Sequence, residues 1–179
     1  RILYIDFDLH HGDGVEEAFY TSDRVFTLSF HHFKEGFFPG TGPLKNIGQD
    51  KGLYRSLNIP LKEGITDIIF EKIFKNVCQA VLKYFQPSVI ITQCGVDGLS
   101  DDTFSVFNIT SLGLGNCFKY LIHNTKQIPL LFLGGGGYDP VSTSRCWTYF
   151  LACAMQIGLV DDIPDHSQFH MYRPSFKLH

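Results

Sequence analysis

Three polar side chains interrupt the apolar start of the chain at alternate positions. Asp6, Asp8 and His10 follow the stretch RILYI and precede HGDG. Because side chains alternate along a strand, these three would point the same way if the strand continued to residue 10. Two carboxylates and an imidazole at the end of a buried strand would be costly without a cation or hydrogen-bonding partners. The spacing therefore predicts a metal site.

The ligand types narrow the choice of metal without fixing it. One imidazole and two carboxylates suit a catalytic zinc with three protein ligands and an open position. The same set also fits iron(II), cobalt or manganese. Hydrolysis at such a site needs a base for the water proton and a group that polarises the substrate carbonyl. Tyr138, which follows the run GGGG, is a candidate for the second role, and no base is obvious.

The composition sets bounds on the protein. A chain of 179 residues with 44% hydrophobic residues can bury one core, and its net charge of -3 argues against a general nucleic-acid surface. No apolar run reaches the roughly 18 residues of a membrane span. The five cysteines form no CxxC pair, which suggests reduced thiols in an intracellular protein. Because Arg1 leads directly into a core strand, we expect the chain to be the C-terminal part of a longer protein.

Strands and helices alternate in the hydrophobic pattern. Strands are expected in the opening stretch and at residues 25–32, 56–61, 88–94 and 128–133. Helices are expected at residues 14–21, between the N-cap Thr66 and Pro87, and at residues 110–126 and 142–157, the last with Trp147, Phe150, Leu151 and Ala154 facing inward. This alternation predicts right-handed βαβ units and an α/β sandwich with a mostly parallel sheet. Residues 160–179 are expected to lie across the surface.

Polar residues follow three of the expected strands. Asp6, Asp8 and His10 follow the first, Asp97 follows SVIITQC, and GGGGY follows IPLLFL. Ligands bind beyond the carboxyl ends of parallel strands, so we expect these residues to meet at one rim. Taken alone, Asp97 could be a helix cap or turn residue, and the glycine run could be a turn or an anion-binding nest. That run lacks the signatures of a P-loop and of a dinucleotide fold.

Five ordered blocks resemble the signatures of class I zinc-dependent histone deacetylases. The blocks are DFDLHHGDG, FFPGTG, QCGVDGLS, LGGGGY and RCWTY, at residues 6–14, 37–42, 93–100, 133–138 and 145–149. GFFPGTG and IPDHSQF are most similar to the eighth-isoform type. The resemblance implies a three-layer, arginase/deacetylase-like fold that is incomplete at its N-terminal side. Residues 1–179 would then be the C-terminal part of a single histone deacetylase catalytic domain.

The resemblance also implies roles for individual residues. Asp8, His10 and Asp97 would be the zinc ligands, with iron(II) as an alternative metal, and Tyr138 would donate a hydrogen bond to the acetyl carbonyl and its oxyanion. Asp6 and Asp13 would orient two catalytic histidines. A potassium ion would be bound by Asp6, Ser29 and the main-chain carbonyls of Asp8, His10 and Phe30.

A narrow tunnel for the acetyl-lysine side chain is implied as well. Phe38 would form one wall, and Phe104 and Gly136 would also line it. Phe104 stands where the family has Leu or Met, so it should narrow or reshape the tunnel mouth. Asp101 stands where a glycine is usual.

Two classes of function follow. The first is hydrolysis of N-acetyl-lysine in histones and other proteins, in the nucleus and cytoplasm, with corepressor proteins as candidate partners and no nucleic-acid or membrane binding. Longer acyl groups or acetylpolyamines are alternative substrates. The second is a non-catalytic product or interaction module, because the family's paired catalytic histidines lie upstream of the block at which this chain begins. We therefore expect the 179 residues alone to be inactive.

Overall fold

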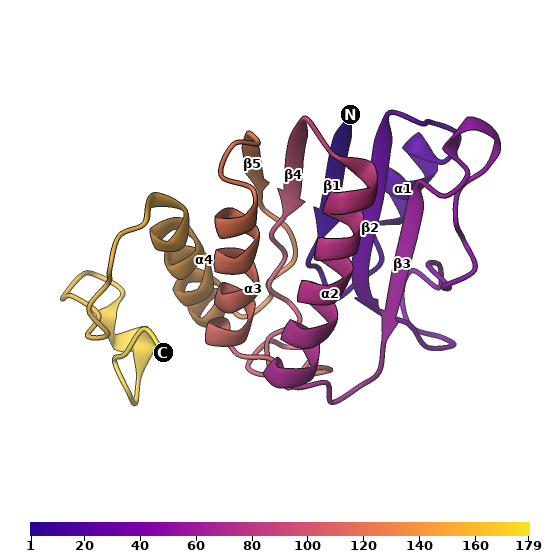
Figure 1. Cartoon of the computed structure of the whole chain (residues 1–179). Helices are drawn as coiled ribbons and strands as arrows, with labels where there is room; N and C mark the ends of the chain where they lie inside the picture. The colour runs from indigo at the N-terminus through magenta and orange to yellow at the C-terminus, as the bar shows by residue number, and fades with distance from the viewer.

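Five parallel strands form the sheet in the computed structural model, which describes all 179 residues (Figure 1). In chain order they are β1 (Ile2–Asp6), β2 (Val25–His32), β3 (Ser56–Leu61), β4 (Val89–Gln93) and β5 (Leu130–Leu133). Their order across the sheet is β3-β2-β1-β4-β5. The central strand β1 pairs Asp6 with Ser29 of β2 and with Gln93 of β4. The carboxyl ends of these three strands therefore lie side by side.

Helices follow the strands in the expected alternation. They are α1 (Asp13–Phe19), α2 (Asp67–Phe85), α3 (Ser111–Asn124) and α4 (Pro140–Met155), with short 3-10 turns η1 (Asp50–Gly52) and η2 (Phe169–Tyr172). Figure 1 shows α2 and α3 in front of the sheet and α1 behind it. The α/β class and the parallel sheet are confirmed. No helix is both long enough and apolar enough to cross a membrane.

Aromatic packing joins α2 to the middle of the sheet. Phe70, Phe74, Cys78, Val81 and Phe85 are the buried residues of α2, and they recur at the spacing of one helical face. The Phe74 ring centroid lies 5.0 Å from that of Phe7 and 5.2 Å from that of Phe30. The main core therefore lies between the sheet and α2, includes Phe7 just after β1, and continues to α3 and α4.

The start of α2 is held differently from the expectation. Thr66 occupies the N-cap position, but its side chain makes no capping hydrogen bond. Instead, the carboxylate of Asp67 accepts hydrogen bonds from Thr110 N at 2.8 Å and from Thr110 Oγ1 at 2.7 Å. Thr110 Oγ1 in turn accepts a bond from Gly113 N, which caps α3. The N-terminal ends of α2 and α3 are thus linked by hydrogen bonds between Asp67 and Thr110.

The prediction of which α4 side chains face inward is wrong in part. Phe150 is 4% exposed, but Leu151 is 62% exposed and Trp147 is 38% exposed, although its indole N–H donates to Cys94 O at 2.8 Å. Apolar side chains of α4 and β5 leave a hollow of about 190 Å³ between them. Helical periodicity identified the apolar positions correctly, but nothing in the chain covers this side of α4.

One face of the sheet is also largely uncovered. Leu131 and Leu133 of β5 are 51% and 43% exposed, and they point away from the face that α2 and α3 cover. Only α1 lies on that side, against β2 (Figure 1). Parallel sheets are ordinarily covered on both faces. This chain therefore forms little of the second helical layer in the three-layer fold that the resemblance implies.

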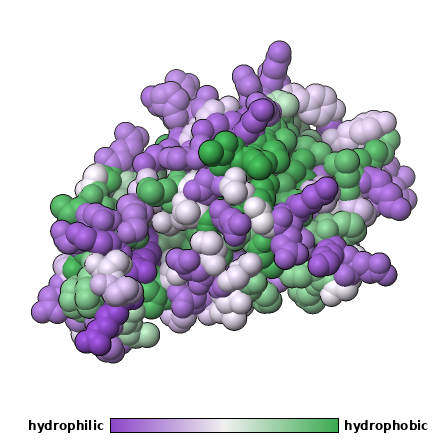
Figure 2. All heavy atoms as spheres, turned by 90° about the horizontal axis from the view of Figure 1, so that it is seen from below, coloured by the Kyte–Doolittle hydropathy of each residue, from purple (hydrophilic) through white to green (hydrophobic).

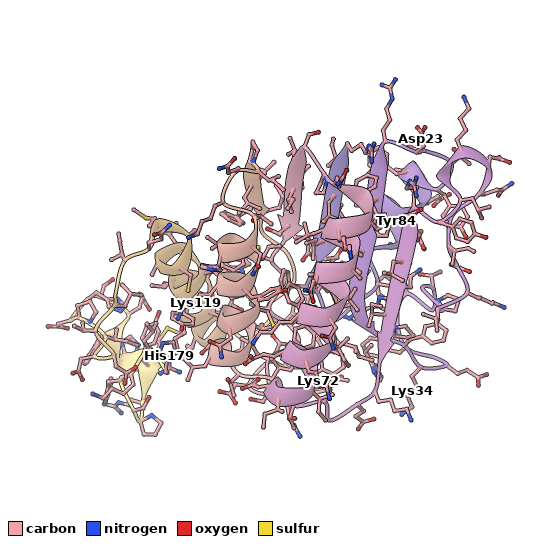
Figure 3. All side chains as sticks on the ribbon, viewed as in Figure 1. Asp23, Lys34, Lys72, Tyr84, Lys119 and His179 are labelled. Atoms are coloured by element: carbon pink, nitrogen blue, oxygen red, sulfur yellow. The ribbon has the colours of Figure 1, made fainter.

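The C-terminal segment lies against α4, as expected for a surface segment. Tyr149 of α4 is contacted from two sides: Lys119 Nζ of α3 donates to its hydroxyl at 2.6 Å, and the His179 ring lies 4.4 Å from its ring. Figure 3 shows Lys119 and His179 on this side of the molecule. A bridge between Asp162 and Lys177 closes the segment on itself. These contacts hold the end of the chain beside α3 and α4.

The aromatic core yields a stability prediction. Phe74→Ala removes a ring that is 0% exposed and should lower the free energy of unfolding by about 3–5 kcal/mol. Ile68→Ala, in the same helix but 81% exposed, should change it by less than about 0.5 kcal/mol. Urea unfolding of both variants measures the difference. Equal losses would show that α2 does not pack on the sheet through Phe74.

Candidate metal centre

The chain leaves β1 in a turn that its own carboxylates stabilise. β1 ends at Asp6, so Asp8 and His10 lie in the following loop and not on a strand. Asp8 N donates to Asp6 Oδ1 at 3.0 Å, and His10 N donates to Asp8 Oδ1 at 2.9 Å. Each aspartate thus accepts from the backbone two residues ahead, as Asp does in turns. Asp6 is therefore the last residue of the strand, whereas Asp8 and His10 belong to the loop.

Asp97 joins Asp8 and His10 from the loop that follows β4, the strand next to β1. Its Oδ2 lies 2.9 Å from His10 Nδ1, which also lies 3.1 Å from Asp8 Oδ1. Its Oδ1 accepts a hydrogen bond from Leu9 N at 2.7 Å. One ligand atom from each of Asp8, His10 and Asp97 falls within 4.8 Å of the others. The predicted convergence of strand ends is therefore confirmed in geometry.

Gln93, the last residue of β4, orients Asp8 and was not identified from the sequence. Its Nε2 donates to Asp8 Oδ2 at 2.7 Å, and its Oε1 accepts from Gly95 N at 2.6 Å. Gly136 N donates to the same Asp8 oxygen at 2.8 Å. The available signal was the position of Gln93 at a strand end, directly opposite Asp6.

Two glycines allow the backbone to approach these carboxylates. A Cβ atom on Gly95 would overlap Asp8 Oδ2, and one on Gly136 would overlap Asp97 Oδ2. By contrast, a Cβ on Gly14 would meet nothing within 4 Å. The carboxylates are thus packed tightly against main chain, which fixes their direction.

The centre concentrates negative charge away from water. Asp6, Asp8 and Asp97 are 2%, 8% and 0% exposed, and none of them forms an ion pair with a lysine or arginine. Burial raises the pKa of Asp6 to about 7 and that of Asp97 to about 6. Hydrogen bonds to Asp8 and Asp97 raise the pKa of His10 to about 9. Proton uptake by these groups thus offsets part of the negative charge of the three carboxylates. A divalent cation would offset that charge more fully.

Aromatic rings surround the exposed side of His10. The Phe37 ring stacks on the imidazole at 5.3 Å, and Phe38, Phe104 and Tyr138 meet it edge-on at 5.9, 5.0 and 6.5 Å. Phe38 is 74% exposed and Phe104 is 45% exposed. Figure 2 looks onto the end of the molecule at which the strands terminate and shows hydrophobic residues gathered among hydrophilic ones. The contact of Phe37 with His10 was not predicted.

Tyr138 lies at the edge of this aromatic group. Its ring is 5.2 Å from that of Phe104, and its backbone N–H donates to the Asp102 carboxylate at 2.6 Å. Partial burial, together with the nearby Asp97 and Asp8 carboxylates, raises the pKa of the Tyr138 phenol. The phenol therefore keeps its proton at neutral pH and can donate a hydrogen bond.

The other predicted site residues lie at or beyond the margin of the centre. Asp6 Oδ2 accepts from the Tyr4 hydroxyl at 3.1 Å, and Ser29 Oγ lies 2.9 Å from His31 Nδ1. Phe30 packs its ring into the core. Asp13 is exposed, and its carboxylate accepts from Gly14 N at 2.7 Å. None of these side chains is grouped with Asp8, His10 and Asp97.

Histidines other than His10 near this end of the sheet are engaged elsewhere. His11 Nδ1 lies 2.8 Å from Thr41 Oγ1, and its Nε2 lies 3.1 Å from Glu16. His31 Nε2 donates to Gly42 O at 2.9 Å, and burial lowers the pKa of His31 to about 4. His32 Nδ1 is 3.1 Å from Leu61 O. His11 and His31 thus contact the loop at residues 41–42, His32 contacts the end of β3, and none of the three belongs to the ligand group.

The comparisons with known proteins cover the same residues. Residues 1–154 match the model of the histone deacetylase domain. Human histone deacetylase 1 is 49% identical over all 179 residues, which cover 36% of that protein. Type-1 histone deacetylase 1 of Dictyostelium discoideum and a histone deacetylase of Drosophila melanogaster are each 46% identical over the same length, which covers 36% and 34% of them.

The chain thus spans about a third of the length of these curated relatives. These matches do not support the finer likeness to the eighth-isoform type. They do support the wider resemblance, because the histone deacetylase domain accounts for most of the residues and includes every residue of the ligand group. The chain belongs to the histone deacetylase family.

Proposed function

We propose that the complete protein containing this chain hydrolyses N-acetyl-lysine in histones and other proteins and depends on zinc. Residues 1–179 would form the C-terminal part of its single catalytic domain. The observation that carries the proposal is the group formed by Asp8, His10 and Asp97, whose ligand atoms fall within 4.8 Å of one another. The Tyr138 ring lies 6.5 Å from the His10 ring at the open side of this group.

The donor set fits the metal cofactor that the family implies. Asp8, His10 and Asp97 would hold it, and two carboxylates with one imidazole suit zinc, with iron(II) as the alternative. The buried carboxylates have no lysine or arginine partner, so a divalent cation would neutralise them. When bound, zinc supplies a Lewis acid that activates water and polarises a carbonyl.

The chain's own side chains would recognise the acetyl-lysine. The neutral, apolar stem would lie between Phe38 and Phe104, whose rings flank His10, with Gly136 at the inner end. Tyr138 would donate its phenolic proton in a hydrogen bond to the acetyl oxygen and would stabilise the charge that develops there. The protonated state of Tyr138 supports this role.

A potassium site is proposed beside the zinc site. Its ligands would be Asp6, Ser29 and the main-chain carbonyls of Asp8, His10 and Phe30. Asp6 and Ser29 are paired in register on neighbouring strands, and the Asp6 carboxylate is buried without a basic partner. A monovalent cation there would offset the charge of Asp6.

Proton transfer would depend on residues outside this chain. The histidines His11, His31 and His32 contact other groups and are not part of the ligand group. We propose that a histidine pair from another part of the complete protein supplies the base and the acid, and that Asp6 and Asp13 orient that pair. Acetylated lysine side chains would be the substrates, corepressor proteins the partners, and the nucleus and cytoplasm the location.

Loss of a metal ligand gives the first test. In the complete protein, Asp97→Ala should abolish zinc retention, because it removes one of three proposed ligands. Asp50→Ala changes an exposed aspartate outside the ligand group and should leave zinc content at one per chain. Metal analysis after dialysis measures both. Near-stoichiometric zinc in the Asp97 variant would refute the ligand assignment.

The glycine beside Asp8 gives a second, milder test. Gly95→Ala should weaken zinc binding by about 10–100-fold, because the new methyl group displaces the Asp8 carboxylate. Gly14→Ala adds the same methyl group where nothing lies within 4 Å and should leave the affinity unchanged. Competition with a coloured chelator reports both affinities. A normal affinity in the Gly95 variant would mean that Asp8 does not bind the metal.

If the catalytic histidine pair lies outside these residues, the 179-residue chain alone should deacetylate little or not at all. A fluorogenic acetyl-lysine substrate measures this against the complete protein, with a zinc chelator as the control for metal dependence. Turnover by the short chain within tenfold of the complete protein would contradict the need for an outside histidine pair. No chelator-sensitive turnover by the complete protein would favour the non-catalytic alternative.

A further inference from the structure

Two loops meet beside the ligand group, and one buried carboxylate lies between them. The first loop, residues 98–106, follows β4, and the second, residues 134–139, follows β5. Asp102 of the first loop is 3% exposed. Its Oδ1 accepts from Phe104 N at 3.1 Å, and its Oδ2 accepts from Tyr138 N at 2.6 Å and from Asp139 N at 3.3 Å. Asp102 therefore binds backbone from both loops.

The chemistry of this contact makes it hard to replace. Asp102 forms no ion pair, so its charge is stabilised by backbone N–H groups. Hydrogen bonds to an ionised acceptor are shorter and stronger than those between neutral groups. Removing the carboxylate would leave three N–H groups without this acceptor, and buried donors without acceptors are costly.

The two loops carry Phe104 and Tyr138, which would surround the reacting end of the proposed substrate. The rings of Phe104 and Tyr138 lie 5.2 Å apart at nearly right angles, and both face the His10 ring. A weaker connection exists between Thr103 Oγ1 and Tyr138 O at 3.2 Å, but it is exposed. The distance from the tunnel wall to the phenol thus depends mainly on Asp102.

We propose that Asp102 is a positioning residue for deacetylation. Its carboxylate fixes the backbone of Tyr138 and Phe104 together, so that the phenol points at the acetyl oxygen while the phenylalanine forms the tunnel mouth. Asp102 itself touches neither substrate nor metal. This inference rests on the proposed deacetylase function, because Tyr138 has no reaction to serve without it.

A double-mutant cycle in the complete protein tests the inference. Asp102→Ala should lower kcat at least tenfold, because Tyr138 is released from its hydrogen bond. In a Tyr138→Phe background, where the phenolic hydroxyl is already absent, the same change should lower kcat less than threefold. Asp101→Ala, which removes an exposed carboxylate from the same loop, is the matched control and should leave kcat within twofold. Zinc content and melting temperature are measured for every variant.

Equal losses from Asp102→Ala in both backgrounds, or a loss no larger than that of Asp101→Ala, would overturn the proposal. If Asp102→Ala does not fold, hydrogen exchange of the backbone amides in the unaltered protein tests the same proposal. The amides of Tyr138 and Phe104 should exchange at least a hundredfold more slowly than that of Thr103, and equal rates would overturn the anchoring. An inactive unaltered protein with slow amides would instead refute the deacetylase function alone.

Discussion

The structure depends on burying three carboxylates at or just beyond the ends of β1 and β4 without a lysine or arginine partner. Asp6, Asp8 and Asp97 are instead held by backbone N–H groups, by the Gln93 amide and by His10. Such an arrangement is stable only if the main chain comes very close, which is why Gly95 and Gly136 have no room for a side chain. The sheet places the aspartates together, and the loops determine where their oxygens point.

The sequence predicted the elements that have strong periodicity and the residues that lie at strand ends. The four α-helices and the strands with predicted bounds lie within two residues of those bounds, because long apolar runs and their breakers are local signals. The short turns η1 and η2 carry no such signal and were not predicted. Asp8, His10 and Asp97 were expected together because parallel strands end at one rim. Gln93, Phe37 and Asp102 were missed, because their roles depend on loop paths that no local pattern encodes.

The exposed side of α4 shows a second limit of prediction from sequence. Helical spacing correctly marks Leu151 and Trp147 as apolar, yet a pattern cannot say whether another element lies against them. The same holds for Leu131 and Leu133 on the open face of β5. Apolar periodicity describes what a surface is suited to contact, and the rest of the fold decides whether the contact exists.

The anchoring of the two loops through main-chain donors has a consequence for how this enzyme family can diversify. Asp102 binds the amides of residues 104, 138 and 139, and every amino acid except proline supplies that donor. A new side chain at position 104 would therefore alter the shape of the proposed substrate entrance without loosening the backbone beneath it. Position 104 thus accepts many side chains, whereas proline would remove the N–H group that Asp102 binds.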